Sequence, residues 1–106
     1  MRPLTLTVLA IAVVMPSLGR AATVSVTIDN YAFAPKTVTV HAGDTIVWTD
    51  RDDVAHTVTA LGNGFDSGAV EPGHTYRHRF TKPGTYAYRC SLHPEMRGTI
   101  LVDPAS

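Results

Sequence analysis

The chain has 106 residues, nine basic and nine acidic side chains, and 44% hydrophobic residues. Its length allows one domain. The even charge offers no basic patch for a nucleic acid, and the apolar residues are spread too widely for a disordered chain.

The N-terminal segment differs in character from the rest of the chain. Arg2 precedes an apolar run over residues 4–15, and small residues lead from there to Ala21. A basic start, a short apolar core and a small-residue exit are typical of a secretory signal peptide. The run is shorter than the ~20 apolar residues that cross a bilayer, which disfavours the alternative of a retained membrane anchor. We therefore predict a signal peptide over residues 1–21 and a periplasmic domain over residues 22–106 that is free of the membrane after cleavage.

The predicted domain reads as short strands separated by turns. Apolar and polar residues alternate with a period of two, which indicates half-buried strands. Such patterns occupy residues 24–28, 37–41, 45–49, 56–59, 76–80, 86–90 and 99–102. Turn signals occupy residues 42–44, 50–53, 62–64, 72–73 and 82–84. Without a helical repeat after Met15, this spacing predicts an all-β sandwich or barrel.

Three metal-binding side chains lie within seven residues, namely Cys90, His93 and Met96. Cys90 has no partner in the chain, so in an oxidising compartment it is an inert buried thiol, an intermolecular disulfide or a metal thiolate. A thiolate, an imidazole and a thioether suit copper better than calcium or magnesium. Zinc is disfavoured because a thioether is a poor zinc ligand. A blue copper site has two histidines, one cysteine and a distant methionine, so one histidine is missing from this segment.

Four other histidines could supply the missing ligand. His41 alternates with apolar residues and should face solvent, whereas His78 shares its face with aromatic residues and fits a core position. His56 follows a charged turn and precedes an apolar strand. It is therefore placed at a strand end, where ligands from separate loops can meet. We predict His56 as the fourth ligand, with His74 as the alternative.

The chain also resembles the cupredoxins, most closely the amicyanin and plastocyanin-like group of blue copper proteins. The segments that carry the resemblance are residues 31–35, 41–48, 55–58, 65–68, 72–73, 80–90 and 93–98. The spacing of two residues on either side of His93 is similar to the short ligand loop of amicyanin. The resemblance implies an eight-stranded Greek-key β-sandwich and one type 1 copper ion. It further implies that His56, Cys90 and His93 are the equatorial ligands and Met96 the axial one.

Two positions depart from the family pattern. Thr57 stands where the family usually has Asn, a position whose backbone N–H donates to the ligand sulfur and whose side chain joins the ligand loops. Thr57 keeps the N–H and offers a hydroxyl, so we expect the connection to persist. Glu95 replaces an apolar residue and places a carboxylate near the copper end, which argues against an inherited amicyanin partner.

The predicted function is a one-electron carrier that cycles between Cu(I) and Cu(II). The alternative is a copper carrier or buffer in copper homeostasis. We do not predict an enzyme, because four protein ligands leave no open position on the metal. Copper oxidases and reductases often flank the cysteine with histidine, whereas Cys90 lies between Arg89 and Ser91.

The predicted partner is a transiently bound redox protein, either a c-type cytochrome or a periplasmic dehydrogenase, and the protein is expected to be a monomer. By resemblance, the ring edge of His93 reaches the surface and serves as the electron port. The expected apolar rim around it comprises Leu92, Pro94, Ala55 and Phe33 or Pro35.

Overall fold

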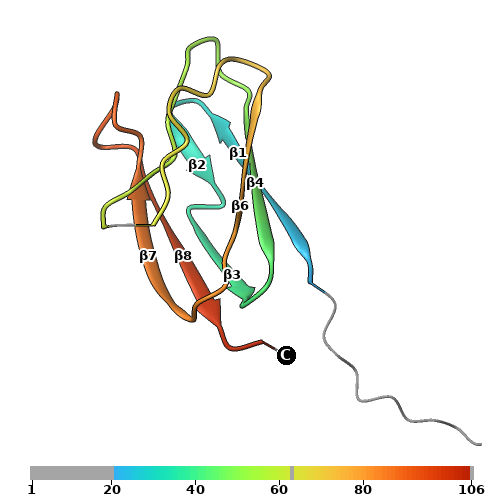
Figure 1. Ribbon diagram of the computed structural model, residues 1–106. Coiled ribbons are helices and arrows are strands. Elements are labelled where there is room, and N and C mark those ends of the chain that lie inside the picture. The colour runs from blue at the N-terminus through green and yellow to red at the C-terminus, as the bar shows by residue number, and fades with distance from the viewer. Residues whose placement is uncertain (1–20, 63, 106) are drawn as a thin grey trace, which may run out of the picture.

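Eight strands account for the regular structure of the chain in a computed structural model that describes residues 21–62 and 64–105 (Figure 1). They are β1 (Thr23–Asp29), β2 (Ala32–Ala34), β3 (Thr37–His41), β4 (Thr45–Asp50), β5 (Thr59–Ala60), β6 (Thr75–Arg79), β7 (Gly84–Arg89) and β8 (Arg97–Asp103). The described ranges contain no helix, and so none that could span a membrane. The predicted signal peptide lies outside them except for Ala21.

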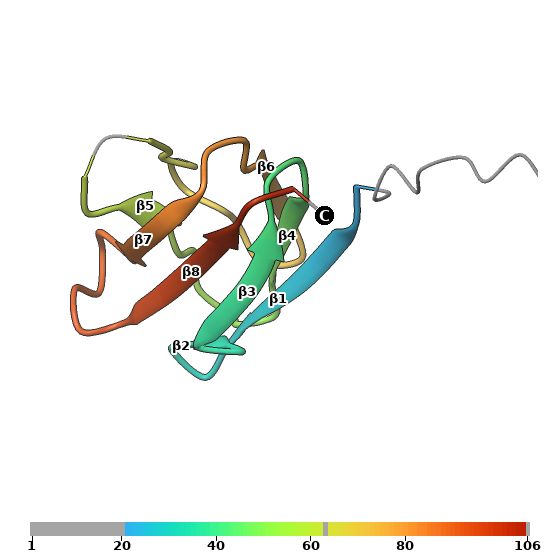
Figure 2. The ribbon, with the colours of Figure 1, turned by 90° about the horizontal axis from the view of Figure 1, so that it is seen from below.

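The strands form two four-stranded sheets, in the orders β2-β1-β4-β6 and β3-β8-β7-β5. Figure 2 shows β8 between β3 and β7 in the second sheet. The pairs β1–β4 and β3–β8 are parallel and the other pairs are antiparallel. Because the chain crosses between the sheets, strand neighbours are often distant in sequence. The predicted eight-stranded Greek-key β-sandwich is confirmed.

The core lies between the two sheets and follows the predicted alternation. Ile46 and Trp48 of β4 are fully buried, as are Tyr88 of β7 and Ile100 of β8. The Trp48 indole N–H donates a hydrogen bond of 3.2 Å to the Tyr88 hydroxyl. Burial raises the pKa of Tyr88 to about 12, against a smaller lowering effect of this hydrogen bond. The bond satisfies two polar groups that would otherwise be costly to bury.

Two local predictions were wrong. Asp50 does not belong to the charged turn but ends β4, where its side chain is fully buried. The strand predicted over residues 56–59 shrinks to β5, because His56 pairs with Val70 in an isolated bridge instead. His56 therefore belongs to the loop between β4 and β5.

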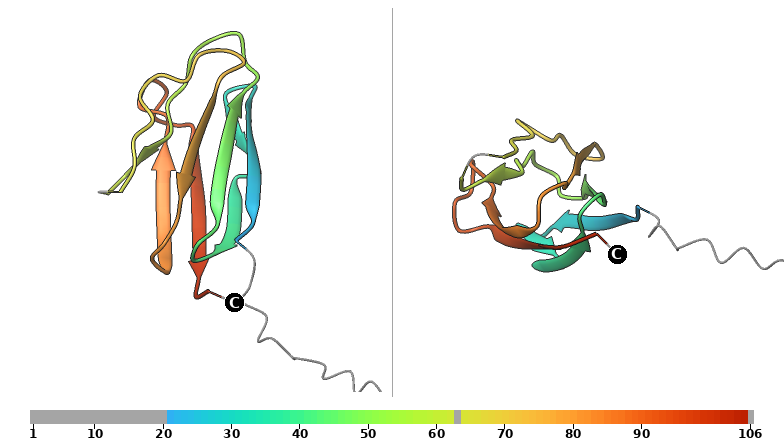
Figure 3. Two further views of the ribbon diagram at one scale, coloured as in Figure 1. Left: turned by 45° about the vertical axis from the view of Figure 1, so that its right-hand side comes forward. Right: turned by 60° about the horizontal axis from the view of Figure 1, so that its bottom comes forward.

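The loops that matter for the site gather at one pole of the sandwich. Strands β1, β4 and β7 all run towards the upper end of the molecule in Figure 1 and in the left view of Figure 3, and the C-terminus lies at the opposite end. The β1–β2 turn, the β4–β5 loop and the β7–β8 loop therefore share that pole. The last two of these loops carry all four predicted ligands.

Gly98 of β8 lies directly under the ring of Tyr88, its partner across the β7–β8 ladder. A Cβ atom at Gly98 would come within 3.0 Å of that ring, which is fully buried and cannot move aside. We expect Gly98→Ala to lower the free energy of unfolding by about 1–3 kcal/mol through overpacking. Gly62→Ala, with no atom within 4 Å of the added Cβ, is the control. Denaturant unfolding measures both, and equal stabilities would contradict the prediction.

Candidate metal centre

Three of the four predicted ligands converge at the pole of the loops. Cys90 directly follows β7, His93 lies three residues later, and His56 comes from the β4–β5 loop. The Cys90 Sγ lies 3.7 Å from His56 Nδ1 and 3.6 Å from His93 Nδ1. All three donor atoms lie within 4.8 Å of one another. The structure therefore brings His56, the distant histidine predicted as a ligand, next to Cys90 and His93.

These separations fit a shared metal ion. Metal–sulfur and metal–nitrogen bonds of about 2.3 and 2.0 Å in a trigonal arrangement would place sulfur and nitrogen about 3.7 Å apart. The observed distances from Sγ to the two nitrogens match this value. His56 and Cys90 are fully buried and His93 is half-buried. The donor set is one sulfur and two imidazole nitrogens, the equatorial set of a blue copper site.

The loop from Cys90 to Met96 is closed by its own backbone. The Cys90 N–H donates to the Met96 carbonyl at 3.0 Å, and the Met96 N–H donates to the His93 carbonyl at 2.9 Å. Met96 is buried in the core cluster that also contains Cys90. Pro94 restricts the backbone of His93 to extended conformations. The short loop thus holds its thioether below the surface on the same side of the domain as the thiol.

Thr57 joins the two ligand loops, as expected from its sequence position. Its backbone N–H donates to Cys90 Sγ at 3.2 Å. Its hydroxyl oxygen accepts a hydrogen bond of 2.7 Å from the Ser91 N–H and lies 3.0 Å from Ser91 Oγ. Threonine therefore makes both the sulfur contact and the connection between the loops in this chain.

The environment of Cys90 favours the thiolate, the form that binds metals. Burial alone would raise the pKa of the thiol. Hydrogen bonds from the Thr57 N–H, from His56 and His93, and from the Leu92 N–H outweigh burial and lower the pKa to about 6. The site is thus prepared to bind a cation.

Asp52 and Tyr31 contact the site and were not predicted. Asp52 Oδ2 lies 2.7 Å from His56 Nε2, the ring nitrogen that faces away from Cys90. The Tyr31 ring packs edge-on against both histidine rings, with centroids 5.2 Å from His56 and 4.9 Å from His93. The Asp-rich run at residues 50–53 was the only signal for the first contact, and it indicated a turn.

The predicted apolar rim needs one correction. Leu92 and Pro94 are exposed and Ala55 is half-buried, as a rim requires. Phe33 is buried at 3% exposure and packs against Tyr88 in the core, with ring centroids 4.6 Å apart. It lies on the inward face of β2, so it does not belong to the rim. Tyr31, 53% exposed, provides an aromatic surface there instead.

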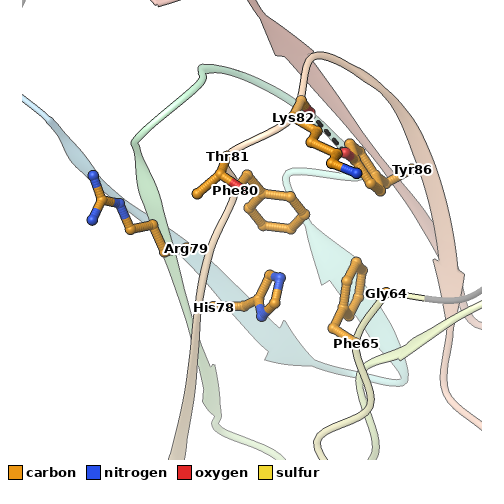
Figure 4. A pocket seen from close by; sticks show the side chains of 8 residues that line it. All are labelled: Gly64, Phe65, His78, Arg79, Phe80, Thr81, Lys82 and Tyr86. Carbon is orange, nitrogen blue, oxygen red and sulfur yellow. Dashed lines mark hydrogen bonds between the residues drawn. The ribbon is translucent and has the colours of Figure 1, made fainter.

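The other histidines stay away from this centre. His41 and His74 are exposed, and His78 lies in a pocket of about 400 Å³ beside Phe65 and Phe80 (Figure 4). Burial lowers the pKa of His78, which favours the neutral ring that packs against these aromatic side chains. No predicted ligand lines this pocket. His78 is therefore a packing residue, as the sequence predicted.

Comparison with known proteins agrees with the fold and the site. The family model of the cupredoxin-like domain matches residues 4–102, so the chain belongs to the cupredoxin family. Amicyanin-alpha of Methylorubrum extorquens is 32% identical over 88 residues, which are 78% of this chain and 74% of that protein. Plastocyanin of Scenedesmus fuscus is 33% identical over 83 residues, with 66% and 85% covered.

Solved structures give the same picture. A Cu(I) structure of an amicyanin variant superimposes with a TM-score of 0.73 and 27% identity over 76% of this chain and 82% of that one. The fold also matches 22% of a copper-containing nitrite reductase from Thermus scotoductus, with a TM-score of 0.71 and 31% identity. The cupredoxin fold therefore occurs both alone and within a larger enzyme.

The Thr57 hydroxyl can be tested separately from its backbone N–H. Thr57→Val leaves the N–H that donates to Cys90 but removes the acceptor of the Ser91 N–H. We expect the free energy of unfolding of the copper-free protein to fall by about 0.5–1.5 kcal/mol, because the partly buried hydrogen bond from the Ser91 N–H is lost. Thr57→Ser keeps the hydroxyl and should retain most of the stability. Equal denaturant midpoints for both variants would contradict this role.

Proposed function

We propose that this cupredoxin is a periplasmic blue copper protein that carries single electrons between redox partners. The observation that carries the proposal is the convergence of Cys90, His56 and His93 at distances that fit one trigonal metal ion. Met96 would be the weak axial ligand from the same loop. Copper supplies the one-electron Cu(I)/Cu(II) couple, and the protein supplies the geometry.

The rigidity of the surroundings supports electron transfer. The hydrogen bond from the Thr57 N–H to Cys90 Sγ and that from the Ser91 N–H to the Thr57 hydroxyl fix the two ligand loops to each other without a metal. Ligand atoms that are held in a geometry intermediate between the preferences of Cu(I) and Cu(II) suit both oxidation states. The atoms of the site therefore need to move little when copper gains or loses an electron. The thioether and the hydrogen bond to sulfur would tune the potential.

Burial of the ligands favours an electron carrier over a copper carrier or buffer. His56 and Cys90 are fully buried, and Met96 is 5% exposed. Release of copper would require opening of the loops, whereas an electron needs only the accessible edge of His93. An exchangeable site for copper delivery would expose more of its donor atoms.

The same site supports a transient protein partner rather than a substrate. Four protein donors would leave no open position on the metal, which argues against an enzyme. The exposed side chains of Tyr31 and Leu92 lie at this pole, beside the half-buried His93. A c-type cytochrome or a periplasmic dehydrogenase could dock there as a short-lived complex with a monomer of this protein.

The copper-loaded protein is expected to be blue, because charge transfer from the Cys90 thiolate to Cu(II) absorbs visible light. Cys90→Ser should abolish the band while the copper-free fold persists. Cys90 has no disulfide partner, so a serine of similar size tests the metal bond directly. Visible and electron-spin spectra check the result. A Cu(II)-loaded wild type without a strong visible band would refute the electron-transfer function.

Export through a signal peptide over residues 1–21 has structural support at its proposed end. The Ala22 N–H donates to Asp44 Oδ1 at 2.7 Å, and Asp44 is only 5% exposed. Hydrogen bonds from Ala22 and His41 lower the pKa of Asp44 against the effect of burial, so a carboxylate occupies this position. Cleavage after Ala21 would convert the Ala22 amide into an ammonium group beside that carboxylate.

This arrangement predicts that the exported protein begins with Ala22, as N-terminal sequencing or intact mass would show. Asp44→Asn should lower the free energy of unfolding of the processed protein by about 1.5–3 kcal/mol, because a hydrogen bond to a charged group is lost. Asp103→Asn, at an exposed position in β8, is the matched control. A processed chain that starts elsewhere would refute the predicted cleavage.

A further inference from the structure

The Asp52 carboxylate contacts three residues, Asn30, Tyr31 and His56. Its Oδ2 lies 2.7 Å from His56 Nε2 and accepts the Tyr31 N–H at 2.9 Å. Its Oδ1 accepts the Asn30 N–H at 2.6 Å. The side chain is only 10% exposed. One carboxylate thus connects a predicted copper ligand with the turn between β1 and β2.

The backbone beneath Asp52 is fixed as well. The Asp52 N–H donates to Asp50 Oδ1 at 2.8 Å. Asp50 is fully buried at the end of β4, and its own N–H and carbonyl bond to His74 and Gly73. The position of the Asp52 carboxylate is therefore set by the first sheet and not by the metal loop.

The turn that Asp52 holds is strained. Asn30 and Tyr31 have φ angles of 51° and 57°, in the left-handed region. This conformation costs a residue with a side chain roughly 1–2 kcal/mol, so it persists only where the surroundings enforce it. The two N–H groups of this turn both point at Asp52. The enforced turn places the Tyr31 ring against His56 and His93.

We propose that Asp52 is the positioning residue of the copper centre: its carboxylate orients His56 through Nε2 and fixes the Tyr31 turn over both histidine ligands. This inference rests on the proposed copper site. With copper bound, the His56 Nε2–H would donate to Asp52, and Nδ1, which lies 3.7 Å from Cys90 Sγ, would lose its proton and face the metal. A carboxylate behind a ligand histidine fixes the tautomer and makes the ring a stronger donor.

The negative charge of Asp52 is expected to lower the reduction potential of the copper site. A more basic His56 stabilises Cu(II) relative to Cu(I), so the carboxylate lowers the reduction potential. The Tyr31 ring packs against both histidine rings, and His56 is fully buried, so little water lies between the Asp52 charge and His56 to weaken its influence. Asp52 therefore acts on the metal through His56 and on the packing of the two histidine rings through Tyr31.

The test compares Asp52→Asn with Asp53→Asn, which removes the same charge from the exposed neighbouring residue. We expect Asp52→Asn to remain blue and to weaken Cu(II) relative to Cu(I) about ten-fold, a rise of about 59 mV for a one-electron couple. Asp53→Asn should shift the potential far less. Asp52→Glu keeps the charge and should restore most of the wild-type potential. Equal shifts for Asp52→Asn and Asp53→Asn would overturn the proposal.

A second measurement needs no copper. In the copper-free protein, amide hydrogen exchange at Asn30 and Tyr31 should accelerate at least ten-fold in Asp52→Ala and remain unchanged in Asp53→Ala. If Asp52 variants do not fold, a proton NMR spectrum of the wild-type protein still tests the proposal. The buried His56 Nε2–H should then give a slowly exchanging signal. Absence of that signal would overturn the proposal. A colourless copper-loaded wild type would instead refute the proposed function.

Discussion

The hydrogen bond from the Thr57 N–H to Cys90 Sγ joins two loops that come from different sheets. His56 precedes Thr57 by one residue, and Cys90 is followed by the loop that carries His93 and Met96. This one contact therefore sets the spacing between the distant histidine and the rest of the donor set. It also contributes to the low pKa of the thiol, so geometry and charge at the site have a common origin.

The β-sandwich makes this contact possible because it places both ligand loops at the same pole. Strands β4 and β7 lie in different sheets but run in the same direction, so their ends meet at one pole (Figure 3). The Trp48–Tyr88 hydrogen bond connects these same two strands across the core. A loss of packing in the core beneath Cys90 would therefore change the distance between the two ligand loops.

Much of this was predictable from sequence because the signals are local. The period-two alternation gave the strands, and the spacing of Cys90, His93 and Met96 defined the donor set. His56 could be predicted as the fourth ligand because it lies between a charged turn and a strand, and such a position is at a strand end. The contacts of Asp52 and Tyr31 were not predictable, because they depend on a two-residue turn and on pairing between distant loops. Asp50 was misplaced because a charged residue rarely ends a strand inside a core.

The parallel pairs have a consequence for the order in which the protein folds. Strand β3 pairs with β8, so Thr37 meets Thr99 near the opposite end of the chain. Such long-range contacts form slowly, because the loop between them must close before any contact offsets its entropy. The donor set is complete only when β8 has docked and the loop from Cys90 to Met96 has closed. A partly folded chain thus lacks the full donor set, and copper would find that set only in the finished fold.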